Sequence, residues 1–247
     1  MTETRAELKA ITFDLDDTLW DNQGVMLATE QGHYQWLLAA LDDWRRTRGE
    51  SALTLSLDGG LADYLERRQA LARATPERRG DFTWLRLRAL EAQLEAAGLG
   101  RSAAILWAGA AMNEFHRLRV QVTPHAEAPE ILEALGQRYR LAAITNGNIH
   151  LKRQPLAAYF SVAVAAGELF TPKPDPHAFL HVLERLEVAP ENAMHVGDSW
   201  EEDVLPASAL GMHAVWIAPE GDRALPERVY RIDHIRRLPA LIERLGR

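Results

Sequence analysis

Acidic residues at the end of the first apolar segment are the first candidates for chemistry. Residues 14–18 (DLDDT) continue the apolar run that begins at Ala10, and Asp14 and Asp16 alternate within them. In an extended strand, this alternation places both carboxylates on one face, with their Cα atoms roughly 6–7 Å apart. Carboxylates so close shift one another's pKa unless a cation lies among them. The segment therefore indicates a cation site, with a solvated turn that caps a helix as the alternative.

A hydroxyl, an amide and a lysine follow two later segments. Thr145 and Asn146 end the apolar run 141–145, where they could donate hydrogen bonds to a phosphate or form an ordinary turn. Lys173 stands between Pro172 and Pro174, and this stiff segment reduces the freedom that its ammonium loses on binding an anion. A surface lysine in a rigid loop is the alternative explanation.

A second acidic segment, 197–203 (GDSWEED), follows the apolar run 193–196. Asp198 lies at the end of that run, and Asp203 lies about one helical turn later, from where it could return toward the same point. Glu201 and Glu202 need no function, because acidic residues favour the positive end of a helix dipole. The first and last aspartates of this segment are therefore further candidate metal ligands.

Several common catalytic motifs are missing from the chain. It contains no phosphate-binding P-loop, no dinucleotide-binding glycine motif, no HExxH zinc motif and no GxSxG nucleophile motif. Cysteine is absent, which excludes disulfides, thiolate metal sites and cysteine nucleophiles. These absences leave the polar residues at the ends of the apolar runs as the candidates for chemistry.

Short apolar runs separated by helical segments must position these side chains. The clearest helix begins at Asp175-Pro176, where a favoured N-cap is followed by proline at the first helical position. The apolar runs are 10–15, 141–145, 162–166, 193–196 and 214–217. Their alternation with helices predicts an α/β fold with a doubly wound parallel sheet. Ligands bind at the carboxyl ends of the strands in such sheets, which is where the candidate residues lie.

Other elements are expected before and after these strands. A helix is expected at 129–136, and another between Trp200 and Gly211, where Pro206 either kinks the helix or begins it. The tail is expected to hold an edge strand near 230–235 and a last helix that ends at Leu245. We assign the tail to packing only.

Residues from Asp21 to about Val120 contain few strand-like runs and many helix formers. Four helices are expected there, at 25–47, 57–74, 81–97 and 102–118. We therefore predict a core domain of residues 1–20 and 121–247, interrupted by a helical domain of residues 21–120.

The composition is that of an ordinary globular protein of 247 residues, with 47% hydrophobic and 26% charged residues. Its 28 basic and 35 acidic residues give a net charge of −7, which argues against non-specific binding of nucleic acid. No apolar run approaches the ~20 residues that span a bilayer, and we identify no secretory signal. We expect a cytoplasmic protein that binds no membrane, and the oligomeric state stays open.

The order of the candidate segments resembles the four motifs of the haloacid dehalogenase-like superfamily of hydrolases. The order is DxDxT after the first strand, Thr after the second, Lys after the third interval, and GD with a later Asp after the fourth. The helical insertion resembles the C1-type cap of that superfamily, and the core would be its Rossmann-like sheet. The resemblance covers the whole chain and implies a Mg²⁺-dependent phosphatase that acts on a small phosphorylated substrate.

The resemblance also implies a role for each motif residue. Asp14 would be the nucleophile that forms an aspartyl-phosphate, Asp16 the general acid and base, and Lys173 the cation that neutralises repulsion. The implied metal ligands are the carboxylates of Asp14 and Asp198 and the backbone carbonyl of Asp16, with Asp203 as an outer-sphere or alternate ligand. The implied substrate-binding residues are Thr145 and Asn146, with Thr18 helping to fix the Asp16 loop.

Asp16 also separates reaction classes within the superfamily. The 2-haloacid dehalogenases resemble this fold but lack a carboxylate at that position, since a leaving halide needs no proton. Asp16 therefore favours a phosphatase. A 2-haloacid dehalogenase, a phosphomutase on the same fold and a non-catalytic binding protein remain alternatives.

Substrate identity depends on the cap and is harder to predict. Residues 13–22, 84–88, 143–148 and 195–198 resemble the proteobacterial phosphatases that act on flavin mononucleotide (FMN) and on the ribitylaminouracil phosphate precursor of riboflavin. Arg86 and Arg88 are candidate substrate-binding residues. Alternate residues cannot both face one side of a helix, so pairing of Arg88 with Glu91 is an alternative role.

Overall fold

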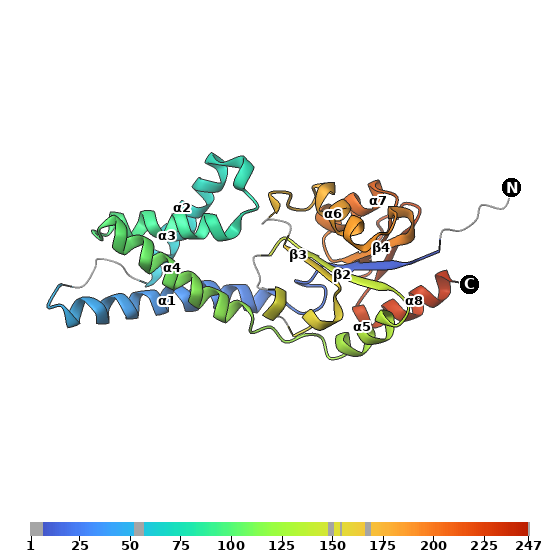
Figure 1. The fold of residues 1–247 in the computed structure, drawn as a ribbon, viewed down its shortest axis with the longest axis horizontal. Coiled ribbons are helices and arrows are strands. Elements are labelled where there is room, and N and C mark those ends of the chain that lie inside the picture. Colours follow the sequence, from blue (N-terminus) through green and yellow to red (C-terminus); the bar gives the residue numbers. More distant parts are fainter. Residues whose placement is uncertain (1–6, 52–56, 148–150, 154, 166–168, 247) are drawn as a thin grey trace. The chain divides into compact units, whose positions relative to one another are not determined.

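The computed structural model describes residues 7–51, 57–147, 151–153, 155–165 and 169–246. They form a six-stranded parallel sheet in the order β3-β2-β1-β4-β5-β6 (Figure 1). The strands are β1 (Ala10–Phe13), β2 (Arg140–Thr145), β3 (Val162–Ala165), β4 (Ala193–Gly197), β5 (His213–Ile217) and β6 (Val229–Ile232). The predicted α/β fold with a parallel sheet is confirmed. Residue 166, the end of one expected run, lies outside the described residues.

β1 is buried along its whole length and lies between β2 and β4. Phe13, its last residue, is opposite Ala143 of β2 and Val196 of β4. The chain builds one side of the sheet through β2 and β3, and then crosses β1 to build the other side from β4 onward. The strand order therefore reverses between β1 and β4, and open parallel sheets bind their ligands at such a reversal.

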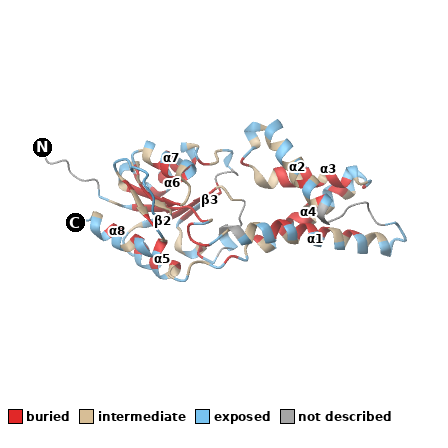
Figure 2. Cartoon of the chain, turned by 180° about the vertical axis from the view of Figure 1, so that it is seen from behind, coloured by how far each residue is buried: buried red, intermediate tan, exposed pale blue. Residues whose placement is uncertain are grey.

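Helices cover both faces of the sheet, and their buried sides face its buried strands (Figure 2). On one face lie α6 (Pro176–Leu186) and α7 (Leu205–Ala209), and on the other lie α5 (Ala128–Gly136) and α8 (Leu238–Leu245) (Figure 1). A strand buried on both faces can be almost continuously apolar, which explains the sequence AITF of β1, where Thr12 is the one polar residue.

α6 begins where the sequence predicts. Asp175 caps it by accepting a 2.9 Å hydrogen bond from the N–H of His177, and Pro176 occupies the first helical position. Phe179 and Val182 are buried with residues of β2 and β3 in one hydrophobic cluster. This capped start fixes the end of the loop that carries Lys173.

The segment after β4 forms two helical elements, where the sequence predicts one helix. Trp200–Val204 forms a π-helical turn, and α7 begins directly after it. Pro206 lies in the first turn of α7, where its missing N–H leaves no helical hydrogen bond unmade. Pro206 therefore marks the start of the helix, and the wide turn before it carries Asp203.

The tail contains β6 at the edge of the sheet and α8, as expected.

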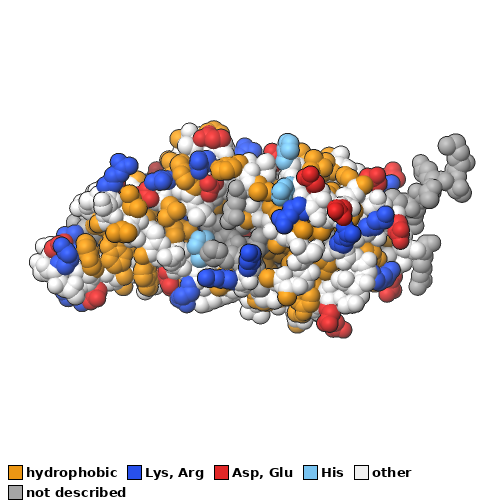
Figure 3. All heavy atoms as spheres, in the orientation of Figure 1, with side chains coloured by type: hydrophobic (Ala, Val, Ile, Leu, Met, Phe, Trp, Pro, Cys, Tyr) orange, Lys and Arg blue, Asp and Glu red, His pale blue; other side chains and the backbone are white. Residues whose placement is uncertain are grey.

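Among the helices that the structure describes, none is long and apolar enough to cross a membrane. On the face shown in Figure 3, Lys and Arg side chains are interspersed with Asp and Glu side chains.

The insertion between β1 and β2 is helical, as predicted, and most of it forms a compact unit of its own, Gln23–Gln121. Its helices are α1 (Gln23–Thr47), α2 (Leu57–Ala74), α3 (Phe82–Ala96) and α4 (Arg101–Arg119). Buried aromatic residues from three of these helices, Tyr34, Tyr64 and Phe115, share its core. The division of the chain into functional domains at 20/21 and 120/121 stays a prediction.

Candidate active site

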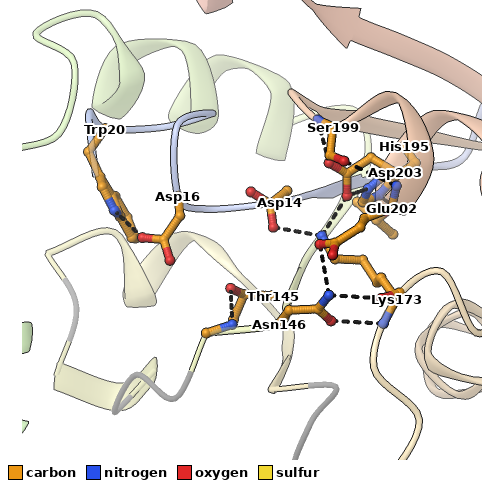
Figure 4. Close-up of polar contacts among 12 residues, drawn as sticks. Asp14, Asp16, Trp20, Thr145, Asn146, Lys173, His195, Ser199, Glu202 and Asp203 are labelled. Carbon is orange, nitrogen blue, oxygen red and sulfur yellow. Dashed lines mark hydrogen bonds and ion pairs between the residues drawn. The ribbon is translucent and has the colours of Figure 1, made fainter. Parts of the chain in front are cut away.

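Side chains that follow β1, β2 and β4 meet at the carboxyl edge of the sheet (Figure 4). Asp14 directly follows β1, and its backbone N–H donates to the carbonyl of Val196 in β4 at 2.8 Å. This bond continues the strand pairing and fixes Asp14 beside the strand that leads to Asp198. Asp14 is only 6% exposed. Its carboxylate is therefore held where water screens neighbouring charges weakly.

Lys173 joins two of the predicted aspartates. Its ammonium donates hydrogen bonds to Asp14 Oδ1 at 2.6 Å and to Asp203 Oδ1 at 2.5 Å (Figure 4). Lys173 is buried, so both ion pairs are shielded from solvent. One ammonium therefore bridges the first and fourth sequence motifs.

Asn146 holds the loop that carries Lys173. Its Oδ1 accepts a hydrogen bond from the Lys173 N–H at 2.8 Å, and its Nδ2 donates to the Lys173 carbonyl at 2.9 Å. The same Nδ2 donates to Glu202 Oε2 at 2.9 Å, so Glu202 also has a partner at the site. The side chain of Asn146 thus positions Lys173. Binding of substrate by the backbone of Asn146 stays a prediction.

The two predicted threonines are both buried. Thr145 Oγ1 accepts a 3.0 Å hydrogen bond from the N–H of Gly147. This bond does not use the hydroxyl hydrogen of Thr145. Thr18 Oγ1 has no hydrogen-bond partner among the described residues. Both hydroxyls are able to donate. Their roles at the phosphoryl group and in the Asp16 loop stay predictions.

The π-helical turn returns Asp203 to the site. Its Oδ2 accepts a 3.0 Å hydrogen bond from the N–H of Ser199, while its Oδ1 contacts Lys173 and, at 3.1 Å, His195 Nε2. A Cβ atom added at Gly197 would overlap the carboxyl group of Asp203. Glycine at this position therefore permits the close approach of the turn to β4.

The sequence did not identify His195, which lies buried on β4. Burial lowers the pKa of His195, which favours a neutral ring despite the opposing effect of Asp203. A carboxylate only accepts, so Nε2–H donates to Asp203, and Nδ1 accepts from the Thr12 hydroxyl at 2.8 Å. Strand alternation is the sequence signal that could have identified His195, because it places this residue on the same face of β4 as Gly197.

Asp14, Asp198 and Asp203 form a cluster that could hold a metal ion. One carboxylate oxygen from each lies within 4.8 Å of the others. Three carboxylates and the Lys173 ammonium leave two negative charges, which a divalent cation would balance. Carboxylate oxygens are the donors that Mg²⁺ prefers, whereas softer metals favour nitrogen and sulfur. The residues therefore fit the divalent site that the sequence predicts.

Burial sets the charge states within this cluster. It raises the pKa of Asp14 well above its ordinary value, against the attraction of Lys173 and with added repulsion from Asp203. It also raises the pKa of Asp198 to about 6, again with repulsion from Asp203. Burial acts in the same direction on Asp203, but Lys173 and His195 outweigh it and hold that pKa below its ordinary value. Without a metal, Asp203 keeps its charge while the other two aspartates resist ionisation.

We expect Asp198 to contribute less to the stability of the metal-free protein as the pH rises from 3.8 to about 6. A carboxyl group with a raised pKa in the folded state favours folding while protonated, so the contribution of Asp198 is complete below the unfolded value and is lost above the folded one. Asp14 acts in the same direction, and the depressed pKa of Asp203 acts at lower pH.

Mg²⁺ binds the ionised carboxylates, so it should raise the melting temperature more at about pH 7.5 than at about pH 5. Thermal denaturation with Mg²⁺ and with EDTA at both pH values measures this difference. The Asp198→Asn variant is the matched control, in which we expect the pH dependence of the Mg²⁺ effect to shrink. A Mg²⁺ effect equal at both pH values would contradict the charge assignment.

The two arginines predicted to bind substrate have partners within the helical unit. Arg86 is buried and donates to Glu30 Oε1 from Nη2 at 2.7 Å and from Nε at 3.1 Å. Arg68 donates to the same oxygen. Arg88 is exposed and donates to Glu91 at 2.5 Å, the pairing that the sequence offered as its alternative. Binding of substrate by Arg86 and Arg88 stays a prediction.

We expect Arg86→Ala to lower the free energy of unfolding by about 3 kcal/mol, because it removes a partner of the buried Glu30 carboxylate. It also removes the guanidinium that lies 4.4 Å from the ring centroid of Phe115. The matched Arg88→Ala variant breaks an exposed ion pair and should change stability by less than about 0.5 kcal/mol. Urea denaturation of both variants measures the difference, and equal losses would contradict it.

Comparison with known proteins finds similarity over nearly the whole chain. A sequence model of the family described as haloacid dehalogenase-like hydrolase matches residues 8–211. The 5-amino-6-(5-phospho-D-ribitylamino)uracil phosphatase YigB of Escherichia coli is 34% identical over 213 residues, covering 86% of this chain and 84% of YigB. The phosphoserine phosphatase of Thermus thermophilus is 31% identical, covering 89% of this chain and 94% of that protein.

A solved structure also resembles the chain closely. It is a crystal structure described as a 2-haloacid dehalogenase from Pseudomonas syringae pv. tomato, with a TM-score of 0.80 and 33% sequence identity. The match covers 96% of this chain and 99% of that chain. The similar proteins thus include two phosphatases and one protein described as a dehalogenase.

Proposed function

Because the chain belongs to the haloacid dehalogenase-like hydrolases, as a phosphoric monoester phosphatase that acts on small phosphorylated metabolites, we propose that it works through an aspartyl-phosphate on Asp14 with Mg²⁺ as cofactor. Family membership alone leaves the residues of the reaction open. The proposal assigns them from the geometry of the site, with Asp14 as nucleophile and Asp16 as general acid and base.

The observation that carries the proposal is the Lys173 ammonium held between Asp14 and Asp203. Oδ1 of Asp14 accepts from this ammonium at 2.6 Å, which leaves Oδ2 as the attacking oxygen. The positive charge reduces the repulsion between the carboxylate and an incoming phosphate dianion. Asp203 holds the ammonium from its other side at 2.5 Å.

Attack by Oδ2 of Asp14 forms a bond to phosphorus while the bond from phosphorus to the leaving oxygen breaks. Asp16 donates a proton to that oxygen, so the product leaves as an alcohol. Asp16 then takes a proton from water, whose oxygen bonds to phosphorus as the bond to Asp14 breaks. Inorganic phosphate leaves, and both aspartates return to their starting states.

The proposed Mg²⁺ would be held by the carboxylates of Asp14 and Asp198 and the backbone carbonyl of Asp16, with Asp203 as an outer-sphere or alternate ligand. When bound, it supplies positive charge to the phosphoryl oxygens. We assign hydrogen bonds to the same oxygens to Thr145 and the backbone of Asn146, and the fixing of the Asp16 loop to Thr18.

A 2-haloacid dehalogenase is the second candidate, since the similar structure from P. syringae carries that description. A leaving halide needs no proton, whereas a leaving alkoxide does. Asp16 supplies a carboxyl group for this transfer, which favours the phosphatase. A phosphomutase would use the same residues but pass the phosphoryl group to a second hydroxyl.

We further propose that the substrate is FMN or 5-amino-6-(5-phospho-D-ribitylamino)uracil. The 34% identity to YigB over most of both chains supports this assignment. Both compounds carry the phosphate at the end of a ribityl chain, so the same bond is broken in each.

Phosphate release from a panel of phosphorylated metabolites tests the proposal. The panel contains both ribityl phosphates and phosphoserine, each assayed with Mg²⁺ and with EDTA. We expect the highest kcat/KM on a ribityl phosphate and a loss of turnover with EDTA. Halide release from a 2-haloacid without phosphate release would favour the dehalogenase, and turnover unchanged by EDTA would overturn the metal assignment.

A further inference from the structure

The side chain of Asp16 is hydrogen-bonded to Trp20, a residue that has no role in the reaction steps above. Trp20 donates its indole N–H to Asp16 Oδ1 at 2.8 Å, and Figure 4 shows the Asp16 side chain turned toward this ring. Trp20 is fully buried, with an exposed fraction of 0%. A buried donor at this distance restrains the carboxyl group of Asp16 strongly.

The backbone of Trp20 is also fixed, at the place where the chain leaves and re-enters the core unit. Trp20 forms an antiparallel bridge with Pro124, and the adjacent N–H of His125 donates to the carbonyl of Leu19 at 2.9 Å. The core unit ends at Asn22 and resumes at Val122. The backbone of Trp20 is therefore held in place by Pro124 and His125, where the chain returns to the core unit.

The bond also restrains the carboxyl group of Asp16 through one of its oxygens. An indole nitrogen only donates, so Oδ1 of Asp16 acts as the acceptor. Trp20 therefore limits rotation of the carboxyl group that would give a proton to the leaving group and take one from water.

We propose that Trp20 is a positioning residue that orients Asp16 for proton transfer. The inference rests on the proposed function, because it requires Asp16 to act as general acid. It predicts that the loss of the indole donor impairs the reaction most where the leaving group needs a proton. A purely structural role for Trp20 would impair all substrates equally.

The test compares Trp20→Phe with wild type on two substrates, an alkyl phosphate and the aryl phosphate of an acidic phenol. The phenolate leaves without a proton, so only the alkyl ester depends on the general acid. Asp16 is also the proposed base in the later water step, which both esters share, so the comparison uses kcat/KM, which covers only the steps up to release of the alcohol or phenolate. We expect kcat/KM for the alkyl ester to fall about tenfold or more, and kcat/KM for the aryl ester to change by less than about twofold. The ratio of the two rates does not depend on the fraction of folded enzyme, so partial unfolding leaves the test valid.

Trp44→Phe is the matched control, because Trp44 belongs to the hydrophobic cluster of the helical unit, with its ring 5.8 Å from the ring of Trp107. We expect it to leave both rates unchanged. In an Asp16→Asn background, we expect Trp20→Phe to cause no further loss of kcat/KM on the alkyl ester. An equal fall on both substrates, or a further loss in the Asp16→Asn background, would overturn the inference. Failure of wild type to release phosphate would instead refute the proposed function.

Discussion

Asp14→Asn is expected to reduce phosphate release by about 10⁴-fold or more, because an amide cannot form the acyl-phosphate bond. The fold should survive, since asparagine has nearly the same shape and its Oδ1 still accepts from Lys173. Burial raises the pKa of Asp14, which means that its ionised form is unfavourable in the metal-free protein. In EDTA at neutral pH, the variant should therefore melt no lower than wild type.

The Asp43→Asn variant is the matched control for this substitution. Asp43 is exposed on α1 and pairs with the exposed Arg46, so its loss should leave both turnover and melting temperature unchanged. Steady-state phosphate release with Mg²⁺ and thermal denaturation with EDTA measure both properties. Turnover by Asp14→Asn within about tenfold of wild type would contradict the assignment of Asp14 as nucleophile.

Lys173→Met is expected to lower kcat by about 10²–10³-fold, because it removes the fixed positive charge beside the attacking carboxylate. It should also lower the free energy of unfolding by about 3–5 kcal/mol, since Asp14 and Asp203 would lose the cation that pairs with both. Phosphate release and urea denaturation measure the two effects. We expect Mg²⁺ to recover part of the stability, because it binds the same carboxylates.

Lys9→Met provides the control for Lys173→Met. The Lys9 side chain is exposed, and its backbone hydrogen bond to the Asn192 carbonyl does not depend on side-chain charge. We expect this variant to match wild type in both assays. If Lys173→Met kept full turnover, the ammonium would have no part in the reaction and the proposed mechanism would be wrong.

The parts of the fold that follow from local chemistry were predictable from sequence. β1 is mostly apolar because both of its faces are buried. α6 begins at Asp175-Pro176 because Asp175 caps the helix and proline is favoured at its first position. The approach of Lys173 to Asp14 followed from a general property of parallel sheets, whose carboxyl ends share one edge. These inferences needed only strand periodicity, capping and topology.

Contacts between distant residues were harder to predict, because residue type does not indicate the partner. The sequence did not indicate that the side chain of Asn146 pairs with the backbone of Lys173, 27 positions away. His195 supports Asp203 only because a π-helical turn, which the sequence did not predict, brings the two together. Arg86 pairs with Glu30 across two helices, and nothing in either segment alone identifies the other.

Trapping of the covalent intermediate tests the central claim of an aspartyl-phosphate on Asp14 most directly. Wild-type enzyme is mixed with excess substrate and Mg²⁺, quenched in acid and treated with borohydride, which reduces an acyl phosphate to an alcohol. We predict homoserine at position 14 by peptide mass spectrometry, dependent on substrate and absent from Asp14→Asn. Active enzyme that yields no reduced residue at position 14, or a reduced residue elsewhere, would contradict the account.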